Sequence, residues 1–229
     1  MDAVVDIYSD MWTQGYSPNQ MRQAWISPTW KGTDKLLASS YRPIALTNHL
    51  SKIFEGVIRE QILDHLKDNG MDDPTQHGSQ KGKSTITQLL AQIDIIFDML
   101  SDGSNVDVVY LDYSRAYDKV DHKVLLSKLY KMGIRGKNLT LITHWLTNRV
   151  QCTKVGASLS QWDQVLSGIP QGSVLGPLLF LLFIWDMKLD HTQLIQNPQL
   201  RSNILKMWMT QRLYQNGRTL MIYRIFKTN

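Results

Sequence analysis

The chain has 229 residues, of which 43% are hydrophobic and 20% charged, a composition that excludes wholesale disorder and supplies apolar side chains for a core. Its single cysteine, Cys152, excludes a disulfide framework and a thiolate zinc cage and indicates an intracellular protein, and no run of about 18 apolar residues predicts a membrane span. The net charge of +5 resides entirely in the C-terminal end, because residues 188–229 carry +6 and residues 1–187 carry −1. Charge alone therefore gives only weak support for a nucleic-acid partner.

The first half of the chain predicts short extended segments followed by two long helices. We expect an amphipathic helix within residues 1–23 and strand-like segments over 24–35 and 41–46. Apolar residues at helical spacing predict helices over 48–69 and 84–101, joined by a polar loop. In the second of these helices we expect one apolar face to be buried: Ile86, Leu89, Leu90, Ile93, Ile96, Phe97 and Leu100.

The second half begins with a segment rich in β-branched and aromatic residues, VDVVYLDY at 106–113, which predicts a buried strand. The elements expected after it are helices over roughly 114–132 and 137–148, a hairpin of 150–155 and 161–166, and an apolar helix that ends near 187. Residues 188–229 show only scattered helical periodicity, and we expect an ill-defined tail there.

Asp112 is the most informative polar residue, because it follows apolar strand residues at the point where the strand ends. A hard divalent cation prefers such an anionic oxygen on a rigid element. The alternative is that Asp112 caps the turn or helix that follows. Asp118 and Asp121 fall in the first turns of the next predicted helix, where negative charge is favoured, and we interpret them as structural.

The loop SGIPQGSVLGP at 167–177 is the second candidate site. The glycines on either side of Gln171 allow the backbone to approach a ligand closely, and the helix that follows begins beside it. The amide of Gln171 can both donate and accept hydrogen bonds. In isolation the same pattern is equally typical of an ordinary tight turn.

Six stretches taken together resemble, in order, the reverse transcriptase of non-LTR (LINE-type) retrotransposons. They are AWISPTWKGTDK (24–35), SSYRPIALTNHLSKIFEGVI (39–58), TQHGSQKGKSTITQLL (75–90), VDVVYLDYSRAYDKVDHKVLL (106–126), KMGIRGK (131–137) and SGIPQGSVLGPLLFLLFIWDM (167–187).

The resemblance implies a helix-rich α+β fold, with the fingers and part of the palm of a right-hand polymerase. By this comparison residues 24–105 form a fingers-like region and 106–187 a partial palm, and residues 1–23, which precede the matching stretches, remain a separate N-terminal helical segment. The palm sheet would be antiparallel and incomplete, built around 106–113 and the hairpin within 150–166. Residues 188–229 would be a divergent basic tail, which a frameshifted coding sequence explains.

The resemblance also implies roles for individual residues. Asp112 matches the first catalytic, metal-binding aspartate of the family. The residues that match nucleotide-contacting positions are Lys31 and Arg42 for the triphosphate, Tyr113 beside the metal, Tyr117 under the sugar, and Gln171 with Gly172 in the positioning loop. The compact ammonium and the bidentate guanidinium suit phosphate oxygens.

The family implies Mg²⁺ as cofactor, an RNA template, a DNA primer and a deoxynucleoside triphosphate as partners, and it allows a nuclear location. Its mechanism needs a second acidic turn, a hydrophobic-aromatic-Ala-Asp-Asp hairpin, after the helix that ends near 187. This chain has no Asp-Asp pair beyond residue 73, so it resembles a domain truncated before that motif. We therefore expect no polymerase activity. The alternatives are a non-catalytic nucleic-acid-binding module and an unstable relic with unburied apolar faces, for instance on the 174–187 helix.

Overall fold

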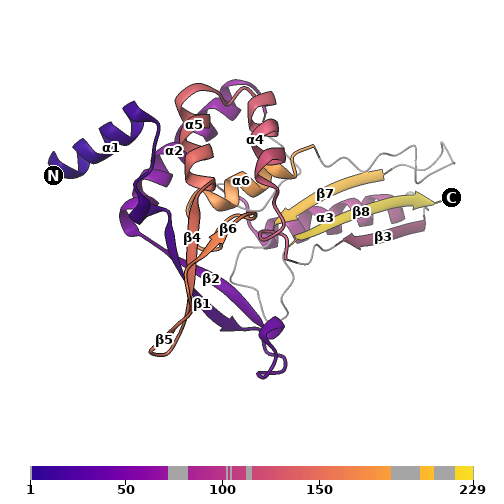
Figure 1. Cartoon of the computed structure of the whole chain (residues 1–229). Helices are drawn as coiled ribbons and strands as arrows, with labels where there is room; N and C mark the ends of the chain where they lie inside the picture. The colour runs from indigo at the N-terminus through magenta and orange to yellow at the C-terminus, as the bar shows by residue number, and fades with distance from the viewer. Residues whose placement is uncertain are drawn as a thin grey trace. The chain divides into compact units, whose positions relative to one another are not determined.

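The structure of the chain is a computed structural model that describes residues 2–71, 82–101, 103, 105–111, 115–186, 202–208 and 220–228. The chain forms two compact units. Unit 1 consists of residues 1–71 and 117–186, and unit 2 of residues 72–116 and 187–229. Figure 1 shows the elements of both units in the colours of the chain.

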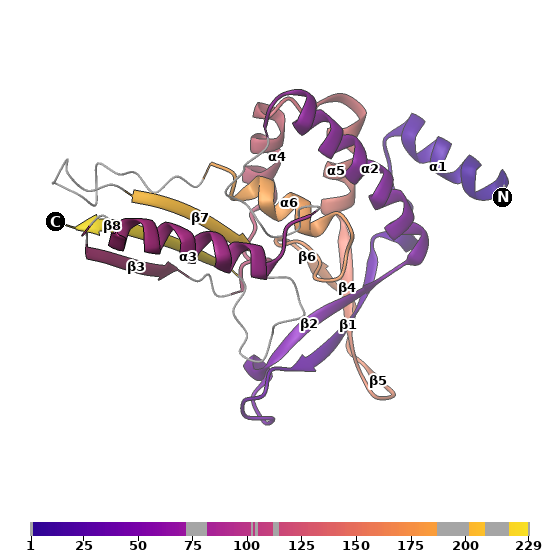
Figure 2. The same cartoon turned by 180° about the vertical axis from the view of Figure 1, so that it is seen from behind.

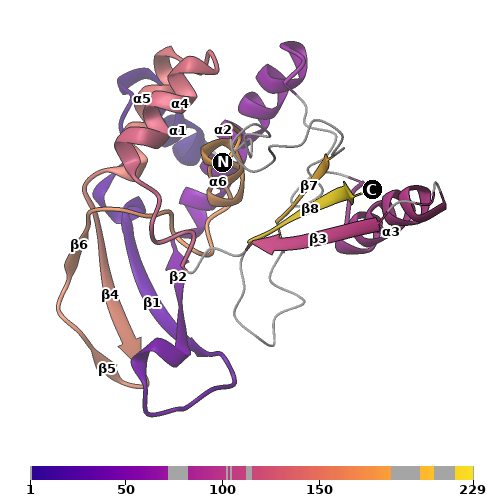
Figure 3. The same ribbon diagram turned by 90° about the vertical axis from the view of Figure 1, so that its right-hand side faces the viewer.

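Unit 1 contains a mixed sheet built from both halves of the chain (Figure 3). Its strands are β1 (Gln23–Trp30), β2 (Tyr41–Thr47), β4 (Arg149–Val155), β5 (Ser158–Leu159) and β6 (Asp163–Val165). Strand β1 pairs antiparallel with β2 and parallel with β4, and β4 pairs antiparallel with β5 and with β6. The alternation of side chains buries Ala24, Ile26 and Ala45 together on this sheet.

Five α-helices of unit 1 gather at one end of this sheet (Figure 1). They are α1 (Asp2–Gln14), α2 (His49–Asp68), α4 (His122–Lys131), α5 (Gly136–Leu146) and α6 (Gly176–Phe183), with short 3₁₀ helices at Asn19–Met21 and Ala38–Ser40. Asn48 caps α2 by accepting from the Leu50 N–H at 2.8 Å, and Asp121 caps α4 by accepting from the Val124 N–H at 2.9 Å. The structural role predicted for Asp121 is thus confirmed.

The apolar helix α6, which the alternative of an unstable relic left partly uncovered, is buried. In α6 the side chains of Leu178, Leu179, Phe180 and Leu182 are at most 5% exposed. The unburied apolar face that the relic alternative assigned to this helix is therefore absent in unit 1, because α4 packs against the helix.

Unit 2 contains a three-stranded antiparallel sheet, in the order β3–β8–β7, with one helix beside it (Figure 2). Its elements are α3 (Thr85–Ser101), β3 (Asn105–Leu111), β7 (Ser202–Trp208) and β8 (Leu220–Thr228). Strand β8 lies between the other two, with Val108 opposite Ile225 and Leu205 opposite Tyr223. Residues 202–208 and 220–228 of the tail therefore form strands, although the sequence showed scattered helical periodicity there. Short apolar runs are compatible with both a helix and a strand.

Two further expectations about sheet partners and boundaries differ from the structure. The 150–166 hairpin does not share a sheet with 106–113, because β4 pairs with β1 and β3 pairs with β8. The two compact units also do not follow the expected boundary at 105. Helix α3 and strand β3 belong to the same unit as the tail, whereas residues 117–186 belong to the same unit as residues 1–71. Pairings between strands far apart in the chain cannot be inferred from their sequence order alone.

Helix α3 presents the opposite face from the one expected. Its buried side chains are Gln88, Gln92 and Met99, whereas Ile86 is 68% exposed and Phe97 is 63% exposed. Periodicity identifies an apolar stripe but not the neighbour that covers it, and the helix packs beside β3 and β7 through its other side. Among the described helices none has the length and apolarity needed to cross a membrane.

Candidate functional site

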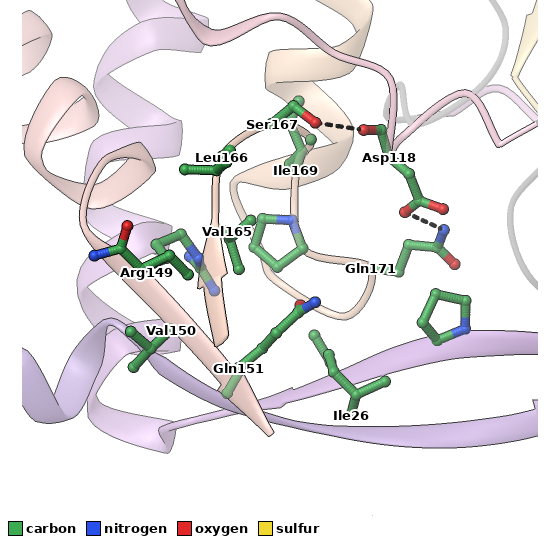
Figure 4. Close-up of a pocket in the computed structure, with 16 residues that line it drawn as sticks. Ile26, Asp118, Arg149, Val150, Gln151, Val165, Leu166, Ser167, Ile169 and Gln171 are labelled. Atoms are coloured by element: carbon green, nitrogen blue, oxygen red, sulfur yellow. Dashed lines mark hydrogen bonds between the residues drawn. The ribbon is translucent and has the colours of Figure 1, made fainter. Parts of the chain in front are cut away.

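The predicted loop 167–173 is fastened along the segment that precedes α4. The Gly168 N–H donates to the Val120 carbonyl at 2.8 Å, and the Ile169 N–H donates to the Tyr117 carbonyl at 2.9 Å. Two side chains add to this attachment (Figure 4): Ser167 Oγ donates to the Asp118 carbonyl at 3.2 Å, and Gln171 Nε2 to Asp118 Oδ1 at 3.4 Å. Residues up to 53 positions apart in the chain are thereby held together.

The same loop is also joined to strand β2. The Ala45 N–H donates to the Gln171 carbonyl at 2.7 Å, and Gly172, which follows, has a φ of +121°. A Cβ at Gly172 would lie 2.5 Å from the Ala45 carbonyl oxygen, so only glycine fits this close approach. The close backbone approach predicted for the glycines around Gln171 is made here to the chain itself.

A buried carboxylate, Glu55 on α2, holds the residues that follow this loop. Glu55 is 1% exposed and accepts from Val174 N–H at 2.7 Å and from Leu175 N–H at 3.2 Å, at the start of α6. Its other oxygen accepts from Ser51 Oγ at 2.9 Å and from Trp145 Nε1 at 3.2 Å. The N–H groups of a helix start favour a negative charge, so Glu55 fixes where α6 begins.

A second buried charge, Arg149 on β4, lies near this carboxylate. Arg149 is 2% exposed, and its guanidinium carbon lies 4.9 Å from the centre of the Trp145 ring. Burial lowers the pKa of Arg149 to about 10, and the negative charge of Glu55 opposes that shift. Trp145 thus contacts both charged residues, donating a hydrogen bond to Glu55 and carrying the Arg149 guanidinium over its ring.

Between the sheet and the loop lies a cavity of about 340 Å³ (Figure 4). Its walls come from strands β1, β2 and β4 and from the segment 164–171. They include Ile26, Arg149, Gln151, Asp118 and Gln171. The cavity combines apolar walls with a few polar groups, an arrangement typical of a small-molecule or nucleotide site.

The structure brings several predicted residues onto unit 1. Gln171 lines the cavity, and Tyr117 is 8% exposed with its ring stacked on Phe180 at a centroid distance of 5.2 Å. Arg42 lies on β2, opposite Thr29 and three residues before Ala45. Lys31 follows β1, where its ammonium donates to the Ser39 carbonyl at 3.3 Å.

Asp112 and Tyr113 lie outside the described residues, so their predicted roles stay predictions. Within the described ranges, no group of three histidine, cysteine, aspartate or glutamate side chains could hold a metal ion. Sequence reasoning missed Glu55, Arg149 and the contact of Asp118 with Gln171. One signal was available, because Glu55 shares the mainly apolar buried face of α2 with Ile58 and Ile62, and a charge there needs partners.

Comparison with known proteins places these features in a family. Residues 30–198 match the family described as "Reverse transcriptase (RNA-dependent DNA polymerase)". The chain is 32% identical over 173 residues to a probable RNA-directed DNA polymerase from transposon X-element of Drosophila melanogaster, covering 75% of this chain and 19% of that protein. It is 29% identical over 183 residues to the RNA-directed DNA polymerase from mobile element jockey of the same species, covering 79% and 20%.

Solved structures agree on the fold. The apo telomerase of Candida tropicalis matches with a TM-score of 0.59 at 10% identity, covering 98% of this chain and 44% of that one. A form of it truncated from its C-terminal domain matches with a TM-score of 0.57 at 10% identity, covering 98% and 48%. The chain spans about a fifth of the length of the curated relatives it matches. The resemblance drawn from the six stretches is confirmed, and the chain belongs to the reverse transcriptase family, with similarity to the RNA-directed DNA polymerases of non-LTR retrotransposons.

Proposed function

We propose that this reverse transcriptase domain supplies the fingers and part of the palm of an RNA-directed DNA polymerase, binds nucleotides through unit 1, and does not polymerise by itself. The observation that carries the proposal is the attachment of the Gln171 loop both to β2 and to the Tyr117–Asp118 segment. Four of the implied nucleotide-contacting residues, together with Gly172, belong to this one unit: Lys31, Arg42, Tyr117 and Gln171.

The chemistry of these groups suits a nucleoside triphosphate. Lys31 and Arg42 belong to the hairpin of β1 and β2, and both are only partly exposed. A cation of each kind stabilises phosphate oxygens, the ammonium as a point charge and the guanidinium through paired N–H groups. Tyr117, held against Phe180, presents a fixed wall next to the loop rather than a mobile side chain.

The proposed loss of activity rests on the acidic residues. The family implies Mg²⁺, which neutralises phosphate charge during transfer, but one predicted carboxylate ligand, Asp112, is too few for the two ions of that mechanism. Beyond residue 187 the sequence has a single acidic residue, Asp190. For comparison, removal of one neutral hydrogen-bond donor from an oxyanion hole already lowers rates by roughly 10²–10³.

A non-catalytic nucleic-acid-binding module is the second candidate, and the charge of the tail favours it. Residues 188–229 carry a net charge of +6, and three of the basic residues, Lys206, Arg224 and Lys227, belong to strands β7 and β8. Binding that depends on phosphate contacts weakens steeply with salt. An RNA affinity that falls with salt and survives Lys31→Ala would favour this reading.

A pair of assays tests the proposal. Primer extension with Mg²⁺ compares the wild type with Asp112→Ala, and we expect no synthesis from either. Binding of a deoxynucleoside triphosphate is measured for the wild type, Lys31→Ala and Arg42→Ala, with Lys67→Ala on α2 as the control. We expect the first two variants, and not the control, to lower affinity by about tenfold, the effect of losing one charge-assisted contact.

Two results would contradict the proposal. Synthesis by the wild type that disappears in Asp112→Ala would show that the chain is catalytically competent. Equal triphosphate binding by the wild type, Lys31→Ala and Arg42→Ala would remove the role assigned to the hairpin.

A further inference from the structure

We propose that an exposed basic and aromatic surface on helix α4 binds a single-stranded nucleic acid, by stacking a base and by contacting phosphates of the strand. This surface, the α4 face, is formed by Lys123, Tyr130, Lys131 and Arg135. The inference goes beyond the proposed function, which assigns nucleotide binding to other residues of unit 1. The α4 face also lies apart from the cavity, whose walls come from other segments of the chain.

Positive charge is concentrated in the segment that contains α4 and α5. Residues 122–162 include seven lysines and arginines and no aspartate or glutamate, although residues 1–187 together carry −1. Two of the seven are engaged inside unit 1, Arg149 by burial and Lys128 by its ion pair with Asp186. The other five are exposed, and in the described part of the chain none of them forms an ion pair. Their charge is therefore open to a partner in solution.

The geometry of α4 brings these side chains to one side of the helix. Lys123 and Tyr130 are seven residues apart, close to two helical turns, so they lie on the same side, and Lys131 follows Tyr130. The opposite side of the helix holds Leu125 and Leu129, which are fully buried in unit 1. Because the helix is anchored through that buried side, the α4 face is held toward solvent.

Stabilisation of the helices does not account for this charge. Lys123 lies in the first turn of α4 and Lys137 in the first turn of α5. The first turn of a helix carries a partial positive charge, so a cation there is unfavourable. Lys131, in the last turn of α4, is the one cation of the α4 face that a helix end favours. A negatively charged partner would balance the others.

Tyr130 and Arg135 add a flat stacking surface to the charges. Tyr130 is 52% exposed, and the guanidinium carbon of Arg135 lies 4.6 Å from the centre of its ring. Nucleic-acid bases stack on aromatic rings and on guanidinium planes, whereas the carboxylates of an acidic peptide use the charge alone. The bases of a duplex are already stacked on one another, so the ligand that uses both features is a single strand.

Binding to the whole chain tests this inference with three probes: a single-stranded RNA of about ten nucleotides, the DNA of the same sequence, and polyglutamate. Tyr130→Leu should weaken strand binding by about tenfold, the effect of losing one stacked base. Tyr130→Phe keeps the ring and should bind like the wild type. Tyr130-dependent binding of either strand supports the inference. Thermal unfolding of each variant shows that the chain is still folded, as expected for exposed positions.

The salt dependence of strand binding tests the charges. The logarithm of the affinity falls with the logarithm of the salt concentration by about 0.7 for each neutralised phosphate of a single strand. The double variant Lys131→Gln, Arg135→Gln should therefore make this slope shallower by about 1.4. Lys154→Gln is the matched control, because Lys154 is exposed and its ammonium lies 4.8 Å from the centre of the Trp25 ring. Lys154 lies where β4 leads to β5, at the end of unit 1 away from α4 (Figures 1 and 2), and its replacement should keep the wild-type slope.

Other outcomes overturn the inference. Strand binding that Tyr130→Leu and the double variant leave unchanged would place the strand elsewhere on the chain, and so would an equal change of slope in Lys154→Gln. Polyglutamate that binds as tightly as the strands, with the same dependence on Tyr130, would make the α4 face a site for an acidic peptide. In each case triphosphate binding that depends on Lys31 leaves the proposed function intact. Conversely, strand binding that depends on the α4 face supports the inference even where triphosphate binding does not depend on Lys31.

Discussion

The carboxylate of Glu55 on α2 lies 2.7 Å from the backbone nitrogen of Val174, a residue 119 positions further along the chain. This contact links the helix that follows the first hairpin to the start of α6, immediately after the Gln171 loop. Since the loop is also bonded to β2 and to the segment before α4, its position is fixed from three sides. Glu55 is therefore the side chain on which the geometry of the site depends most directly.

Glu55→Gln should lower the free energy of unfolding by about 3 kcal/mol, because the amide nitrogen that replaces one carboxylate oxygen cannot accept the two buried hydrogen bonds which that oxygen accepts. Urea unfolding, followed by tryptophan fluorescence, measures this change in stability. The control is Glu60→Gln on the same helix, whose ion pair with Arg59 is largely exposed and should contribute less than about 1 kcal/mol. Equal effects of the two substitutions would show that Glu55 is not a structural anchor.

The pH dependence of stability should carry a contribution from His144. Burial and the nearby charge of Arg22 lower the pKa of His144, and its Nδ1 accepts from the Ser17 N–H at 3.1 Å. The unfolded chain then takes up a proton near pH 6.5 that the folded chain takes up only at lower pH. Stability from this group is complete above pH 6.5 and is lost as the pH falls below it.

His144→Gln keeps an acceptor and removes this titration, so urea unfolding between pH 5 and 7.5 should show a shallower slope than in the wild type. His49→Gln, at the exposed start of α2, is the control and should keep the wild-type slope. A slope that His144→Gln leaves unchanged would assign the pH dependence to other groups.

Sequence patterns predicted the existence of the helices of unit 1 because their signals are local, although α4 begins at His122 and not near residue 114 as expected. The caps Asn48 and Asp121 and the apolar spacing of α2 each act within a few residues. The site was only partly predictable. Gln171 stood out through its flanking glycines, whereas Arg149 gave no signal, since its burial depends on α2 and α5 rather than on its neighbours in the chain. The tail strands were missed for the same reason, because β8 is defined by its pairing with β3.

Lys128 on α4 should stabilise the end of α6. Its ammonium donates to the Phe183 carbonyl at 2.6 Å and to Asp186, whose pKa the hydrogen bond from Lys128 lowers. A cation at a helix C-terminus is favourable, so Lys128→Met should lower stability by about 1 kcal/mol, read as a decrease in the midpoint of thermal unfolding. Lys123→Met, on the same helix and exposed, is the control, and an equal decrease there would contradict a specific role for Lys128.

Gly172→Ala should be among the most damaging single changes in the loop. The residue has a φ of +121°, which side chains rarely adopt, and the added Cβ would lie 2.5 Å from the Ala45 carbonyl oxygen. We expect a loss of about 3 kcal/mol or more in urea unfolding, since backbone strain adds to a steric clash with another strand. Gly156→Ala is the matched control, because Gly156 has a φ of +59° but nothing within 4 Å of the added carbon, and its loss should be about 1 kcal/mol. If both substitutions cost the same, the loop does not lie against β2 in solution, and the attachment that carries the proposed function is absent.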